Sequence, residues 1–129
     1  MSYGIYVQRF AHGDAAPMDD ALGRELLAPY VVSSRPEFGF TRIRASDGGQ
    51  ADVHASPGSI AVSRFAWGGI LDIVADLADR LDAVVLLPEG VAVLGAAEQR
   101  RHLPVELRAD AVVVGLSGAA LRAAIAGAG

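Results

Sequence analysis

The chain has 129 residues, no cysteine, a formal net charge of −4 and 52% hydrophobic residues. This length fits a single domain over residues 1–129, and the lack of cysteine excludes disulfide bridges and thiolate-ligated metals. The acidic balance argues against a general nucleic-acid binder, and no apolar run reaches the roughly 20 residues of a membrane span. With no leader pattern at its start, we expect a cytoplasmic protein. We also expect no metal site and no cofactor, because no motif for either is found.

The first part of the sequence predicts a strand, a helix and a loop. Residues 4–10 alternate with a period of two, which is typical of a strand, and a turn is expected at 11–14. A helix is expected from about residue 19 or 20 to residue 27, because acidic residues precede a stripe of leucines. Residues 33–36 are expected to form a loop.

Residues 38–45 and 50–55 predict a hairpin around Asp47-Gly48-Gly49, because a short loop with a left-handed glycine closes many hairpins. The expected register gives the pairs Ile43–Val53 and Ala45–Ala51 on one face, and Arg44–Asp52 and Arg42–His54 on the other. One face would then be apolar and the other charged, with a favourable cross-strand ion pair.

The remaining sequence predicts further strands and two helices. Ile70, Val74, Leu77 and Leu81 recur at helical spacing, and residues 98–108 look irregular. The expected strands are 59–65, 83–87, 91–94 and 111–114, and the expected helices are 70–81 and 118–126.

This order of elements predicts an α+β fold with a mostly antiparallel sheet of about five to seven strands. Two or three helices would pack mainly on one face of the sheet, and a ferredoxin-like arrangement is a special case of this pattern. The second face must then be solvated, covered by a partner or used for binding.

That second face is the first place where we expect function. Arginines around a histidine could bind a carboxylate or phosphate while aromatic rings pack against the ligand, although a solvated outer face would explain the same charges. The candidate binding residues are Phe38, Phe40, Arg42, Arg44, Arg64 and Trp67.

A catalytic interpretation uses histidine beside a carboxylate, because the carboxylate fixes the imidazole tautomer of a general base. The candidate residues are His54, His12, Asp52 and Asp14. A small isomerase, cyclase or hydrolase would place such a His–Asp pair in a pocket between sheet and helices, lined by Phe65 and Trp67. The histidines and aspartates show no recognised metal-binding spacing.

Three segments resemble short uncharacterised proteins of GC-rich actinobacteria: Arg9 to Asp14, Leu26 to Tyr30 and Asp47 to Val53. The resemblance covers about residues 5–107 and rests on turn and core residues, so it implies no site. Acidic α+β proteins of this size and origin are often similar to immunity proteins that neutralise toxins.

Two functions from different classes remain as hypotheses. The first is a non-catalytic binding module that holds a protein partner, as an immunity-type inhibitor or accessory protein, and the negative net charge would favour a basic partner. The alternative is the small enzyme or ligand-binding domain. A homodimer and a small-molecule ligand are open alternatives for the uncovered sheet face.

Overall fold

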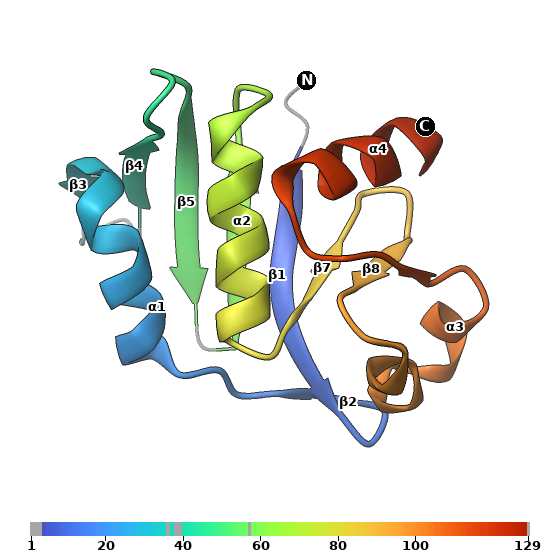
Figure 1. Cartoon of the computed structure of the whole chain (residues 1–129). Coiled ribbons are helices and arrows are strands. Elements are labelled where there is room, and N and C mark those ends of the chain that lie inside the picture. Colours follow the sequence, from blue (N-terminus) through green and yellow to red (C-terminus); the bar gives the residue numbers. More distant parts are fainter. Residues whose placement is uncertain (1–3, 36, 38–39, 57, 129) are drawn as a thin grey trace.

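The computed structural model describes residues 4–35, 37, 40–56 and 58–128 and shows an α+β fold on one open, mostly antiparallel sheet (Figure 1). Nine strands of the described chain pair in the order β3-β4-β5-β6-β1-β7-β8-β9, and β2 pairs with β1 beside this path. They are β1 Gly4–Ala11, β2 Asp14–Ala16, β3 Val31–Arg35, β4 Phe40–Arg44, β5 Gln50–Ser56, β6 Ser59–Ser63, β7 Val84–Leu86, β8 Ala92–Leu94 and β9 Val112–Val113.

The helices α1, α2 and α4 lie together on one face of the sheet (Figure 1). Helical segments of the described chain are α1 Asp20–Leu27, α2 Gly69–Arg80, α3 Val105–Arg108 and α4 Gly118–Ala128, with 3₁₀ turns η1 Ala28–Tyr30 and η3 Ala97–His102. None of these helices is long and apolar enough to cross a membrane.

The main core fills the space between these helices and the sheet. Alternate residues of a strand point to opposite faces, so Ile5 and Val7 of β1 face the helices and are fully buried. Val74 and Leu77 of α2 and Leu121 of α4 are buried against them. This face of the sheet is therefore occupied by the protein's own core.

On the opposite, outer face, the described residues form a cover at the β7–β8 end alone. There Val84 and Leu94 pack in a second apolar cluster with Leu103 and Ala111, which come from the segment that carries η3 and α3. Towards β3, the outward residues of β4 and β6 are half-buried or exposed. A broad part of the outer face is thus free of other described elements.

The structure confirms the α+β class and the antiparallel sheet but corrects the number and arrangement of elements. Residues 33–36 were expected as a loop, yet Val31–Arg35 forms the edge strand β3, which pairs with β4 from Val31 opposite Ile43 to Arg35 opposite Phe40, and residue 36 lies outside the described residues. The ferredoxin-like expectation is wrong, because four strands, not two, separate α1 from α2. Nine described strands and four described α-helices exceed the expected counts.

Two more segments differ from the sequence expectation. The turn expected at 11–14 includes the start of β2, which folds back on β1 and pairs Ala11 with Asp14. The irregular stretch at 98–108 contains η3 and α3. Their short apolar contacts, Leu103 above all, were hidden in a polar sequence that lacks helical periodicity.

The predicted hairpin exists, but its register is shifted by two residues. Ile43 lies opposite Ala51 instead of Val53, and Arg42 lies opposite Asp52 instead of His54. The loop is displaced by one residue to 46–48, where the Ala45 amide donates to the Gly49 carbonyl oxygen at 2.8 Å, and the Asp47 carboxylate holds it against the start of α2. A shift of two preserves the facing of every side chain, so the predicted charged and apolar faces are correct.

Candidate functional site

Six side chains from the strands β3 to β5, one from the residue after β6 and one from β1 share the free part of the outer sheet face. Directly paired residues of neighbouring strands point to the same side, which places Arg42 with Asp52 and Phe40 with His54. We call this surface the arginine face. Its residues are Tyr6, Arg35, Phe40, Arg42, Arg44, Asp52, His54 and Arg64.

Asp52 is the centre of this surface and, among the described residues, the only charged or polar one that is buried, with 5% exposure. Its Oδ1 accepts a hydrogen bond from Arg42 Nε at 3.1 Å, and its Oδ2 lies 4.0 Å from Arg64 Nε. A buried carboxylate is costly unless it is paired. The two guanidinium groups provide that pairing.

Arg64 reaches Asp52 because its backbone departs from the strand. Ser63 lies opposite Asp52 and therefore faces outward, so regular alternation would turn Arg64 towards the helices. Instead Arg64 has a φ of 51°, in the left-handed region that non-glycine residues rarely adopt. This local strain directs a second guanidinium to the same carboxylate.

Aromatic rings lie beside the ion pairs. The rings of Phe40 and His54 meet edge to face with centroids 5.3 Å apart. The guanidinium of Arg42 lies 5.8 Å from the centroid of the Phe40 ring, within range of a cation–π interaction. Tyr6 continues the same row beyond Ala61 and is 48% exposed.

Arg44 has a partner of its own in Gln50, which stands opposite it. With the Gln50 amide oriented to accept, its oxygen lies 3.0 Å from Arg44 Nη2 and 3.3 Å from Arg44 Nε. Sequence analysis did not single out Gln50, Arg35 or Tyr6. The outward alternation of residues 6 and 50 was a signal that could have identified two of them.

The geometry of the guanidinium groups favours anion binding. Each guanidinium carries five N–H donors, and Arg42 and Arg64 direct Nε towards Asp52. Their Nη ends can then take a carboxylate or phosphate with two parallel hydrogen bonds. The side chains of Arg42 and Arg64 are 44% and 71% exposed, so an external anion can reach them.

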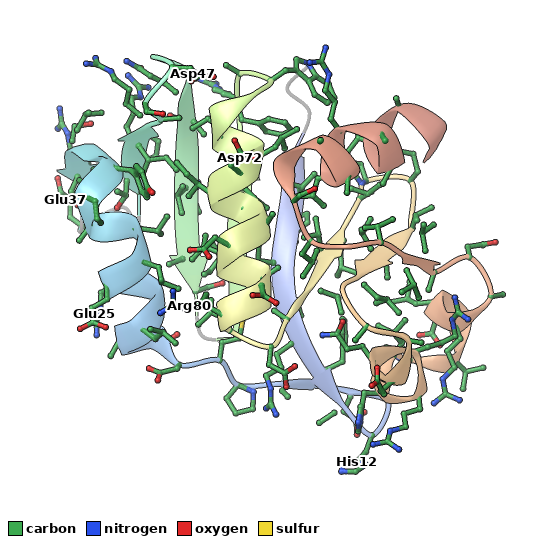
Figure 2. All side chains as sticks on the ribbon, in the orientation of Figure 1. His12, Glu25, Glu37, Asp47, Asp72 and Arg80 are labelled. Carbon is green, nitrogen blue, oxygen red and sulfur yellow. The ribbon has the colours of Figure 1, made fainter. Side chains whose placement is uncertain are left out.

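The expected catalytic histidines lie apart, at two different places in the fold. His54 packs against Phe40, while the carboxylate of Asp52 contacts two arginines. His12 lies in the turn between β1 and β2, at the opposite end of the molecule from Asp47 (Figure 2). Its amide N–H donates to Nδ1 of His102 at 3.1 Å, and Asp14 is exposed nearby in β2.

The remaining predicted binding residues have different outcomes. Phe38 lies outside the described residues. Trp67 is 48% exposed, but its ring contacts Phe65 edge to face and Arg122 of α4, so it belongs to the helix side of the molecule. The arginine face therefore brings together Phe40 and the three predicted arginines without Trp67.

Pockets occur elsewhere in the structure. One of about 360 Å³ is lined by Phe10, Asp79, Asp82, Glu98 and His102, among others. Phe65 and Trp67, expected in a pocket wall, line neither this pocket nor those beside Met18, Gly118 and Tyr30. Among the described residues, no three His, Asp or Glu side chains gather as potential metal ligands.

Two aspartates join neighbouring elements, since Asp47 connects the hairpin loop to α2 and Asp72 connects α2 to α4. Asp47 accepts hydrogen bonds from the amides of Gly69 and Gly49 at 2.9 and 3.0 Å, and these bonds hold the pKa of its carboxyl below the ordinary value of 3.8. Asp72 of α2 accepts from the amide of Gly118 at the start of α4 (Figure 2). The Asp47 carboxylate thus caps the glycine turn at Trp67-Gly68-Gly69.

Comparison with known proteins identifies no similar protein. No protein-family model matches the chain, and neither a curated protein nor a solved structure matches it.

Proposed function

We propose that the protein is a non-catalytic binding module that holds a protein partner on the arginine face, as an immunity-type inhibitor or accessory protein. The observation that carries this proposal is the pair of exposed guanidinium groups, Arg42 and Arg64, that share the buried carboxylate of Asp52. Arginine and aromatic residues dominate the binding energy of many protein interfaces. Both types gather on this uncovered face.

The contacts of His54 support binding over catalysis on the arginine face. A general base needs an imidazole whose tautomer is fixed by a carboxylate or similar group. His54 contacts the Phe40 ring, and the oxygens of Asp52 are directed at arginines. On the arginine face, the carboxylate that a His–Asp pair would need already serves the two guanidinium groups.

The experiment that tests this function isolates the partner from the native host. Tagged wild-type protein is purified gently alongside a Tyr6→Ala/Phe40→Ala variant, which removes two rings from the arginine face. A Val105→Ala/Val112→Ala variant is the matched control, because these side chains are 73% and 40% exposed and come from α3 and β9. Native mass spectrometry identifies any stoichiometric second polypeptide.

We expect the wild type and the control to retain the same polypeptide, and the Tyr6→Ala/Phe40→Ala variant to bind it at least about tenfold more weakly in a titration of purified components. The proposal is wrong if no polypeptide copurifies in stoichiometric amount, or if the variant holds the partner as tightly as the wild type. A retained small molecule in place of a protein would favour the ligand-binding or enzyme alternative.

A further inference from the structure

We infer that the arginine face takes an extended acidic segment of its protein partner, with carboxylates at alternate positions and an apolar side chain next to them. This inference rests on the proposed binding function and names the chemistry of the partner. The following paragraphs give the charge, the donor geometry and the spacing that lead to it.

The charge of the arginine face is opposite to that of the whole chain. The face carries four arginines and one acidic residue, Asp52, whereas the chain has a net charge of −4. Salt at physiological concentration screens exposed charges beyond about 8 Å, so a docked segment responds mainly to the surface it touches. That surface favours an acidic segment, although the net charge alone would favour a basic partner.

The donor geometry favours a carboxylate that binds with both oxygens. Asp52 fixes Arg42 through Nε at 3.1 Å and faces Arg64 Nε at 4.0 Å, so the buried carboxylate positions both guanidinium groups. The single negative charge of Asp52 neutralises only one of the two guanidinium groups, so one positive charge remains. An incoming carboxylate can bond the outer Nη atoms in the side-by-side geometry that arginine and carboxylate share.

The spacing along β4 matches an extended chain. Arg44, Arg42 and Phe40 are successive outward residues of this strand, each about 6.8 Å from the next, as alternate residues of an antiparallel strand are. An extended segment that runs along β4 repeats its side chains at the same distance. One carboxylate would meet the Arg42–Arg64 pair, a second at an alternate position would meet Arg44, and an apolar side chain on the other side would meet the Phe40 and His54 rings.

A protein segment fits this surface better than a nucleic acid does. Single-stranded nucleic acids need a positive track over several nucleotides. Four of the other arginines have partners away from the face: Arg9 pairs with Asp82, Arg100 and Arg108 donate to backbone carbonyls, and Arg122 lies over Trp67. The positive surface is therefore short, which suits a few carboxylates.

The test uses a fluorescent peptide, Leu-Thr-Glu-Thr-Glu-Thr-Leu, whose outer leucines serve both chain directions. A control peptide of the same composition, Leu-Thr-Thr-Glu-Glu-Thr-Leu, places its glutamates on opposite sides of an extended chain. Both are titrated by fluorescence anisotropy with the full chain, with Arg42→Gln/Arg64→Gln, and with Arg24→Gln/Arg80→Gln. The last variant removes the same charge from α1 and α2.

We expect the alternating peptide to bind at least about tenfold more tightly than the control peptide. The Arg42→Gln/Arg64→Gln variant should lose at least that factor, and the helix variant should bind as the wild type does. Equal binding of both peptides, or no binding of either, overturns the inference. So does a deoxythymidine oligonucleotide that binds more tightly than the peptide at the same ionic strength.

The host partner separates this inference from the proposed function. A partner that is lost by the Tyr6→Ala/Phe40→Ala variant but held normally by Arg42→Gln/Arg64→Gln would keep the binding function and exclude the acidic segment. A partner that neither variant affects would exclude both. Circular dichroism of each variant confirms that the fold is intact before binding is compared.

Discussion

Arg64 adopts a strained backbone conformation that brings its guanidinium group to Asp52. Its φ of 51° is unfavourable for a side chain with a Cβ atom, by about 1 kcal/mol or more. The ion pair of Arg64 with the buried Asp52 carboxylate, at 4.0 Å and with the Arg64 side chain 71% exposed, is the weaker of the two pairs that Asp52 makes. Backbone strain of this kind is expected where a side chain is placed for binding.

We therefore expect the free energy of unfolding of Arg64→Gly to exceed that of Arg64→Ala by about 1 kcal/mol, because glycine adopts positive φ without a steric penalty. Both variants should bind the alternating acidic peptide more weakly than the wild type. Urea denaturation measures the stabilities. An Arg64→Ala protein as stable as Arg64→Gly would show that the left-handed backbone costs nothing here.

At the level of elements, sequence patterns predicted which residues share a face better than they predicted which residues meet. The alternation along β4 and β5 correctly placed Arg42, Asp52 and His54 outward. It could not fix the register, because the hairpin loop is held by a contact between Asp47 and Gly69, which are far apart in sequence. The backbone turn at Arg64 was equally hidden, since no residue type signals it.

The start of α2 depends on a charged cap, so its stability should depend on pH. Asp47 has a lowered pKa in the folded state, so its stabilising effect is present above the ordinary carboxyl value of 3.8 and is lost as the pH falls through the folded value. Asp47→Ala should unfold at lower urea concentration at neutral pH. Its difference from the wild type should shrink between about pH 5 and about pH 2.

Urea unfolding at several pH values measures this difference, with Asp47→Asn as a second variant. The asparagine oxygen can still accept one amide but carries no charge, so Asp47→Asn should lose less stability than Asp47→Ala at neutral pH. The difference in stability between these two variants should not change with pH, because neither carries a titrating group at position 47. A difference between the wild type and Asp47→Ala that stays constant down to about pH 2 would contradict the charged cap.

The start of α4 depends on the absence of a side chain at Gly118. A Cβ atom there would overlap Asp72 Oδ1 and lie 2.9 Å from the Asp72 backbone nitrogen. Gly118→Ala should therefore lower the free energy of unfolding by about 1 to 3 kcal/mol, although alanine normally favours a helix. The loss would come from the broken cap and from displaced packing between α2 and α4.

Gly127 of the same helix is the matched control, because no atom lies within 4 Å of a Cβ placed there. Gly127→Ala should leave the stability unchanged or raise it by up to about 1 kcal/mol. Thermal and urea unfolding measure both variants. Equal changes in the free energy of unfolding at the two glycines would mean that the contact between Gly118 and Asp72 does not stabilise the fold.

At the level of the whole molecule, the distribution of charge matters more than its sum. The net charge of −4 is a sum that includes the helices α1 and α2, with five acidic residues and two arginines, and the arginine face, with four arginines and one acidic residue. Composition could not reveal this separation, because it depends on which strands are neighbours. The sheet order was likewise beyond local pattern analysis, since it is set by packing between distant segments.

The central place of β1 has a consequence for how the protein is made. β1 precedes the other strands in the sequence and pairs at its end with the short β2, yet the strands that flank Ile5 and Val7 in the sheet are β6 and β7, and β7 begins only at Val84. A ribosome that adds about 5 to 20 residues per second would need several seconds to deliver them. During that interval the apolar side of the emerging strand, with Ile5 and Val7, has no sheet to enter. The nascent chain is thus most prone to aggregation before α2 has been synthesised. A chaperone that binds the first dozen residues would protect the chain during this interval.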